Sequence, residues 1–130
     1  MEHPVMYSGN DFGLAEVRRT CLALPDAHET LTFGRPWFRV KKTFAVFGGG
    51  TKGPESQTFP SAVIFLPDPD TRLALLQDQR AFVPAYFGPN GWMGLDLTAE
   101  PVDWQEIAEL IEESYRNTAP KRLVALLDRP

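Results

Sequence analysis

The chain has 130 residues, of which 43% are hydrophobic and 23% charged, and its formal net charge is −4. This length fits one domain covering residues 1–130, which buries roughly two thirds of its unfolded surface and needs no disulfide or metal to hold a core. The negative charge disfavours non-specific attraction of the whole molecule to DNA or to anionic membranes.

The cysteine content and the lack of long apolar runs predict a cellular location. Cys21 is the sole cysteine, so an intramolecular disulfide is excluded and a reducing compartment is favoured. Residues 1–12 lack the basic and then apolar order of a secretory signal. The apolar run at residues 62–66 is far shorter than the roughly 20 residues that span a bilayer. We therefore expect a cytoplasmic protein without a membrane partner.

The first predicted element is a helix. Apolar side chains recur at three- or four-residue steps over residues 11–24, namely at Leu14, Val17, Cys21 and Leu24. Ser8 or Asn10 is the expected N-cap, because a short side-chain oxygen accepts a hydrogen bond from a free backbone N–H. Pro25 ends the helix.

Residues 30–66 predict strands instead. Aromatic and β-branched residues, separated by turn formers, indicate strands at residues 30–33, 37–41, 43–47 and 61–66. In the second strand the alternation puts Phe38 and Val40 on one face, and Trp37, Arg39 and Lys41 together on the other, in solvent. A sheet with one apolar and one polar face requires helices on the apolar side alone.

A helix and two further extended segments follow. Asp68 or Asp70 is the expected N-cap of a helix whose inward residues are Leu73 and Leu76. Pro84 makes residues 82–87 an edge strand or an extended connector. After a turn at residues 88–91, residues 92–97 alternate as a strand.

The clearest local signal is a helix near the C-terminus. Asp103 and Glu106 match a capping box. The buried stripe is expected to contain Ile107, Leu110, Ile111 and either Ser114 or Tyr115. A short last helix carries Leu123, Leu126 and Leu127. The whole order predicts a two-layer α+β fold, with an antiparallel sheet of about five or six strands and helices packed on one face.

Several kinds of active site are not supported by the residues. Gly48, Gly49 and Gly50 precede Lys52, but no helix pattern follows, so a loose connection of about a dozen residues is favoured over a phosphate-binding loop. The histidines and Cys21 are not spaced for zinc, so we predict no metal and no cofactor.

A catalytic site is not predicted either. Cys21 lies on the apolar stripe of its helix, where a small buried hydrophobe is favoured over a reactive thiolate. Ser114 faces the core, and no acid, base and nucleophile converge. The sequence predicts a non-enzymatic binding module.

The first functional hypothesis is a DNA-binding surface. The stretch from Thr30 to Gly53 has no acidic residue and contains five basic residues: Arg35, Arg39, Lys41, Lys42 and Lys52. We name these five residues the basic block. Together with Trp37 they offer cations for phosphates and a planar ring for bases. The alternative is that the outer face of a sheet carries Lys and Arg only to stay soluble.

The second functional hypothesis is a small-molecule pocket, or a patch for a protein partner or self-association. It depends on four aromatic residues in the second half of the chain: Tyr86, Phe87, Trp92 and Trp104. Large aromatic side chains are typical of ligand pockets and of exposed interaction patches.

Three segments resemble the MmcQ/YjbR-like family over about residues 11–127. They are "CLALPDAHETLTFGRPWFRVKKTFAVF", "PAYFGPNGWMGLDL" and "LIEESYRNTAPKRL". The matching positions are Leu24, Pro25, Glu29, Phe33, Gly34, Phe38, Val40, Phe44, Ala45, Trp92, Ser114 and Tyr115.

The resemblance implies a strongly bent antiparallel sheet, similar to the arrangement of bacterial frataxin and the type III secretion chaperones. It also implies DNA binding through a double-wing surface. The glycine-rich insert at residues 48–59 departs from the family pattern and would change the reach of such a wing. The matching residues themselves are typical of turns and packing rather than of a phosphate clamp.

Overall fold

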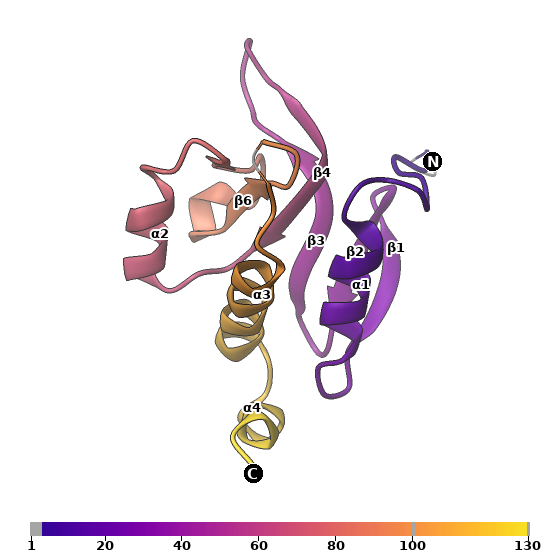
Figure 1. The fold of residues 1–130 in the computed structure, drawn as a ribbon, viewed down its shortest axis with the longest axis vertical. Coiled ribbons are helices and arrows are strands. Elements are labelled where there is room, and N and C mark those ends of the chain that lie inside the picture. The colour runs from indigo at the N-terminus through magenta and orange to yellow at the C-terminus, as the bar shows by residue number, and fades with distance from the viewer. Residues whose placement is uncertain (1–3, 100, 130) are drawn as a thin grey trace.

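The computed structural model describes residues 4–99 and 101–129 and shows one sheet with four α-helices (Figure 1). The elements in chain order are α1 (Leu14–Leu22), β1 (His28–Thr32), β2 (Arg35–Arg39), β3 (Thr43–Gly50), β4 (Thr58–Phe65), α2 (Pro69–Leu75), β5 (Ala81–Phe82), the 3-10 helix η1 (Gly88–Asn90), β6 (Met93–Asp96), α3 (Trp104–Thr118) and α4 (Lys121–Leu127). The predicted α+β class is therefore confirmed.

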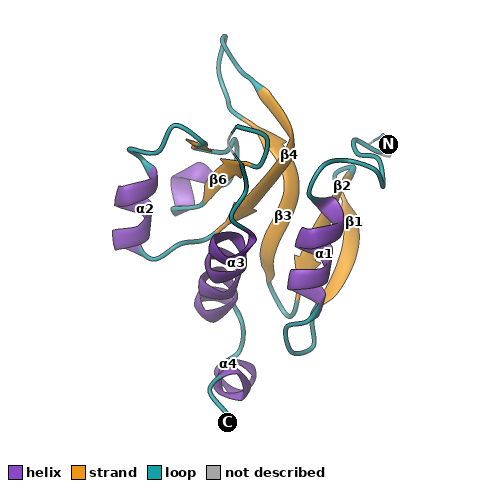
Figure 2. Cartoon of the chain, viewed as in Figure 1, coloured by secondary structure: helices purple, strands orange, loops and turns teal. Residues whose placement is uncertain are grey.

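The sheet is antiparallel at every pairing. Its strand order is β1-β2-β3-β4-β6-β5, and β3 pairs with β4 through a hairpin whose tip projects beyond the rest of the molecule (Figure 2). β3 continues through all three glycines to Gly50, and β4 begins at Thr58. The predicted connection of about a dozen residues is wrong, because only residues 51–57 lie between the strands.

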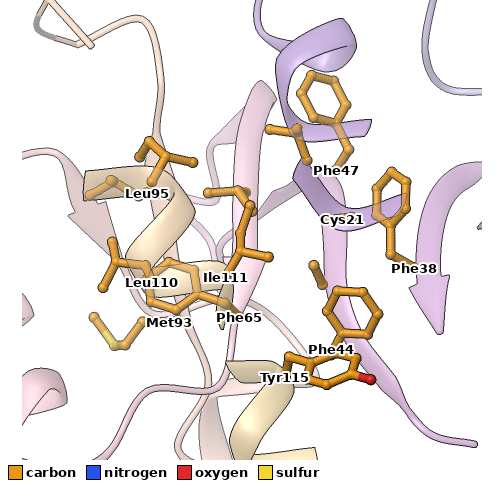
Figure 3. Close-up of a cluster of buried hydrophobic side chains, with 14 of the residues drawn as sticks. Cys21, Phe38, Phe44, Phe47, Phe65, Met93, Leu95, Leu110, Ile111 and Tyr115 are labelled. Carbon is orange, nitrogen blue, oxygen red and sulfur yellow. The ribbon is translucent and has the colours of Figure 1, made fainter. Parts of the chain in front are cut away.

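All four helices lie on one face of the sheet, as predicted, and we call it the helix-covered face. Each helix contributes to a single buried cluster, with Val17 from α1, Leu75 from α2, Ile111 from α3 and Leu123 from α4. Figure 3 shows the rings of Phe38, Phe44, Phe47 and Phe65 in this cluster, together with Ile111 and Tyr115 of α3. Phe44 and Tyr115 meet edge to face, with ring centroids 5.2 Å apart.

Ser114 and Tyr115 are both buried, and each ties α3 to a distant segment. The Ser114 hydroxyl donates to the Phe44 carbonyl and accepts from the Leu66 backbone N–H at 2.8 Å. The Tyr115 hydroxyl donates to the Pro25 carbonyl at 2.7 Å. These residues and their partners stabilise the fold, which agrees with the structural interpretation of the family motifs.

Two predicted helix details are wrong. The N-cap of α1 is Gly13, with a φ of 85°, because Ser8 and Asp11 hydrogen-bond within the preceding turn. In α2 the buried residue is Leu75, whereas Leu73 and Leu76 are exposed. The N-cap of α2 at Asp68 is confirmed, although its side chain makes no capping hydrogen bond.

The predicted capping box of α3 is half correct. The Asp103 carboxylate accepts from the backbone N–H groups of Gln105 and Glu106, as expected for an N-cap. The Glu106 carboxylate pairs with Arg80 at 2.8 Å instead of returning to the cap. Arg80 also pairs with Asp78, so this cluster joins the segment before β5 to the start of α3.

The second face of the sheet is apolar, contrary to the prediction of a polar face. Val46, Ala62, Ile64 and Phe82 are buried there, and Trp37, Phe59, Phe87 and Trp92 pack against them. None of the helices α1–α4 contributes to this cluster, and we call this side the open face. The misjudged strands are β3 and β4, whose apolar side chains are continuous rather than alternating, the pattern of strands buried on both faces.

Candidate ligand pocket on the open face

A cavity of about 840 Å³ opens on this face, within the range of small-molecule sites. Val46 on β3 and Ile64 on β4 supply its buried apolar floor. Trp37 from β2 and Phe87 from the segment after β5 lie beside that floor, with ring centroids 5.5 Å apart. The connector at residues 51–57 forms another side of the cavity.

The rings at the pocket form a continuous chain. Phe33 lies 5.7 Å from Trp37, and Phe87 lies 5.4 Å from Trp92, measured between ring centroids. Trp92 packs against the cluster behind the cavity, whereas Phe33 and Tyr86 line the cavity itself. Phe33 is 62% exposed and Tyr86 is 86% exposed. The site therefore offers flat apolar surface to solvent at its rim.

Both rim aromatics have a backbone conformation that bulky residues rarely adopt. Phe33 has a φ of 50° and Tyr86 a φ of 70°, and the one other described non-glycine residue with positive φ is Asp26. Such positions cost on the order of 1–3 kcal/mol each and cluster at ligand-binding sites. Phe33 precedes Gly34 in a two-residue turn in which both φ values are positive, as the type I′ hairpin requires.

Hydrogen bonds hold Tyr86 in this conformation. The Phe87 N–H donates to the Ala85 carbonyl at 2.8 Å, which closes a three-residue γ-turn around Tyr86, and γ-turns with positive φ are rare and strained. The Ala85 N–H donates to the Gly50 carbonyl at 2.8 Å, so this turn is tied to the end of β3. The strained rim is thus fixed to the same strand that supplies the floor.

Gly48 explains part of the glycine run. It has a φ of 84° at an irregularity in the β3–β4 pairing, and a Cβ atom there would overlap Nη1 of Arg35. A glycine at this position therefore lets the Arg35 guanidinium lie against the β3 backbone. Any larger residue would both strain the backbone and displace the guanidinium.

Arg35 is the notable polar group of the pocket. Its Nη1 atom is buried and has no hydrogen-bond partner among the described residues. Burial lowers the pKa of the Arg35 guanidinium, and the charge of Asp11 opposes that change more weakly. The group nevertheless stays protonated, since arginine does not deprotonate in proteins.

The structure divides the basic block into two groups. Arg35 and Lys52 line the pocket together with Trp37. Arg39 is the last residue of β2, and Lys41 and Lys42 lie in the turn before β3, exposed. Arg39 lies four residues along β2 from Arg35, a separation of about 13 Å.

The prediction that Trp37, Arg39 and Lys41 project together from one strand into solvent is wrong. β2 ends at Arg39 because the strand pairing shifts there, so Lys41 belongs to a turn. Trp37 is half-buried between Phe33 and Phe87 rather than open to water. Phe38 faces the helix-covered core, as predicted.

Three of the four predicted pocket aromatics lie at the open face. Tyr86 and Phe87 line the cavity and Trp92 supports Phe87. Trp104 does not join them, because it begins α3 and packs with Phe12 against the other core, with ring centroids 6.2 Å apart. Phe33, Val46 and Ile64 also line the cavity and were not predicted, although the unbroken apolar runs of β3 and β4 signal the last two.

Charged and reactive groups elsewhere have other partners or are buried. Arg18 pairs with Glu29 through two hydrogen bonds of 2.7 and 2.9 Å. The hydrogen bond from Arg80 holds the pKa of Asp78 below its usual value. Cys21 is fully buried, and burial raises the pKa of its thiol well above the usual value. Residues 4–99 and 101–129 contain no cluster of three or more His, Cys, Asp or Glu suited to a metal ion.

The comparisons with known proteins agree with this architecture. A YjbR family profile matches residues 22–117, about three quarters of the chain. The chain belongs to the YjbR family. The segments with family resemblance therefore lie largely within the match, and Tyr115, Ser114, Pro25 and Phe44 are joined by the hydrogen bonds described above. Family membership assigns no specific binding role.

One solved structure shows the same fold. The crystal structure of the Deinococcus radiodurans protein DR2400, which has a DUF419 domain, is similar with a TM-score of 0.60 and 18% sequence identity. The similarity covers 100% of this chain and 94% of that one. No curated protein matches the chain. No helix within the described part of the chain is long and apolar enough to cross a membrane.

Proposed function

We propose that the protein binds a small organic ligand in the open-face pocket, with a flat apolar part of the ligand against Trp37 and Phe87. The observation that carries this proposal is the pair of exposed aromatic residues, Phe33 and Tyr86, which line the cavity with positive φ. The hairpin turn accounts for the backbone of Phe33, but folding does not account for Tyr86, whose ring is 86% exposed while its γ-turn is strained. A ligand that covers the rings would offset that cost.

A thermal-shift screen with planar aromatic compounds tests the proposal. A ligand at 100 times its dissociation constant stabilises the folded state by about 2.7 kcal/mol, so the melting temperature of a domain of this size rises by several degrees. Trp37→Leu should abolish the rise. Trp104→Leu is the matched control, because Trp104 is equally half-buried but lies on the helix-covered side. If hits stabilise Trp37→Leu as strongly as the wild type, the pocket is not their binding site.

DNA binding is the second candidate function. One observation favours it: Arg39, Lys41 and Lys42 gather at the β2–β3 turn, and none forms an ion pair with another described residue. Unpaired cations at a turn are available to phosphates. This surface is distinct from the pocket, which contains Arg35 and Lys52.

The salt dependence of DNA binding shows how many residues of the basic block contact phosphates. Anisotropy titrations with labelled duplex should give a slope of log affinity against log salt of about −2.7 if three residues contact phosphates, and about −4.5 if all five do. Arg39→Glu combined with Lys41→Glu should abolish binding. Absence of binding at low salt, or unchanged binding by this double variant, would end the DNA hypothesis.

A further inference from the structure

The partly buried side chain of Arg35 gives the pocket a chemical preference. Arg35 lines the cavity, and its Nη1 atom is buried against the β3 backbone at Gly48 without a hydrogen-bond partner among the described residues. A buried donor without a partner costs about 1–3 kcal/mol and more when it is charged, so such groups are uncommon unless a ligand or water completes them. Arg35 is therefore poised to donate hydrogen bonds to a group that enters the cavity.

The charges around the cavity favour an anion as that group. Arg35 and Lys52 are the charged residues of the lining, and no acidic residue lines it. Glu55, in the same connector as Lys52, does not line the cavity, and neither does Asp11, whose charge raises the pKa of Arg35 by less than burial lowers it. Because Arg35 is partly removed from solvent, a charge-assisted hydrogen bond there is stronger than one in open solvent.

The position of Arg35 is also fixed in advance. It lies on the same face of β2 as Trp37, two residues away, so its guanidinium and the indole ring approach one ligand from the same strand. Gly48 leaves space for the guanidinium against β3. The planar guanidinium group, held in this position, matches the hydrogen-bonding geometry of a carboxylate, sulfonate or phosphate group.

We infer that the ligand of the pocket is an aromatic or otherwise planar anion, whose acidic group binds Arg35 while its apolar part packs on Trp37 and Phe87. This inference rests on the proposed function of the same pocket and specifies its ligand class. Lys52 sits on the projecting hairpin, exposed, and contributes a weaker, more solvated attraction to the same anion.

Two fluorescent compounds with one ring system test the inference. 8-Anilinonaphthalene-1-sulfonate carries an anion, whereas N-phenyl-1-naphthylamine has the same rings without it. The sulfonate should bind the full-length protein at least 10-fold more tightly, because a hydrogen bond to a charged group is worth about one to two orders of magnitude in affinity. Trp37→Leu should weaken the binding of both compounds.

Arg35→Met should remove the preference for the sulfonate and leave the affinity for the neutral compound unchanged. Arg39→Met is the matched control, since it removes the same charge from the same face of β2 outside the cavity, and the preference should persist. Equal affinity for the two compounds, or a preference that survives Arg35→Met, would overturn the inference and leave the pocket itself standing. If neither compound binds the wild type, the proposed pocket function fails as well.

Discussion

The two faces of the sheet are built from the same strands but differ in how completely their aromatic side chains are covered. On the helix-covered face, the buried hydroxyls of Ser114 and Tyr115 each have a backbone partner, and the surrounding rings are closed off from solvent. On the open face, Phe33 and Tyr86 are exposed with positive φ, and Arg35 has a buried nitrogen without a partner among the described residues, as Arg72 of α2 also has. The first face therefore holds the fold together, whereas the second is the face on which we propose that a ligand binds.

The largest expected contrast between the faces is in thiol reactivity. Cys21 is fully buried, and its raised pKa keeps the thiolate fraction at pH 8 below that of an exposed cysteine. Ser56→Cys places a second thiol on the exposed connector beside the pocket. A thiol-specific reagent should label that thiol at least about 1,000-fold faster, because Cys21 reacts only when the core opens.

Mass spectrometry of the labelled peptides gives both rates in one sample. A bound pocket ligand should slow labelling at position 56 and leave Cys21 unchanged. If Cys21 is modified as quickly as the introduced thiol, the helix-covered face is not closed, and the contrast between the faces does not hold.

Ring deletion gives the next largest effect. Phe44→Ala removes a fully buried ring that meets Tyr115 and should lower the free energy of unfolding by about 4 kcal/mol. Phe87→Ala on the open face should lower it by about 1–2 kcal/mol, since that ring is half-buried. Urea denaturation followed by circular dichroism measures both values, and equal losses would contradict the division of roles between the faces.

Substitutions of polar residues test the same difference between the two faces of the sheet. Ser114→Ala leaves the Phe44 carbonyl and the Leu66 N–H without their partner, so we expect a loss of about 2–3 kcal/mol in urea denaturation. Arg35→Met removes a charged group that has no partner at Nη1 and should cost no more than about 0.5 kcal/mol. A loss at Arg35 as large as that at Ser114 would show that the guanidinium holds the fold rather than a ligand.

The last expected effect is a small gain in stability at the rim of the pocket. Tyr86→Asn should raise the free energy of unfolding by about 1 kcal/mol, because asparagine tolerates positive φ better than a bulky side chain does. Tyr86→Ala is the control, since alanine keeps the Cβ atom and its strain without the ring. Thermal unfolding of both variants measures the change in stability. A destabilised Tyr86→Asn would mean that the positive φ of Tyr86 does not lower the stability of the fold.

The features that depend on nearby residues along the chain could be predicted from the sequence. The periodicity of α3 and the N-cap at Asp103 appear in the structure as expected, and so does the inward position of Phe38. The family resemblance also proved correct. These features depend on neighbouring residues along the chain, and their patterns survive in any tertiary context that buries the same stripe.

The candidate site was harder to predict because it depends on distant segments. Alternation along β2 placed Trp37 opposite Phe38, but only the return of residues 84–87 over the sheet covers the indole with Phe87. Trp92 and Trp104 look alike in sequence, yet β6 and α3 place them on different sides of the sheet. The strain at Phe33 and Tyr86 has no signal in residue type, since bulky aromatics normally avoid positive φ.

The bonds made by Ser114 and Tyr115 also have a consequence during protein synthesis. Their partners at Phe44 and Pro25 lie 70 and 90 residues earlier in the sequence. A nascent chain that has emerged only as far as β6 already has the strand pairs but lacks α3, so the Phe44 ring and its carbonyl remain uncovered. Translation therefore exposes the hairpin of β3 and β4 before its cover arrives, and this interval is when a chaperone would be most useful to the chain.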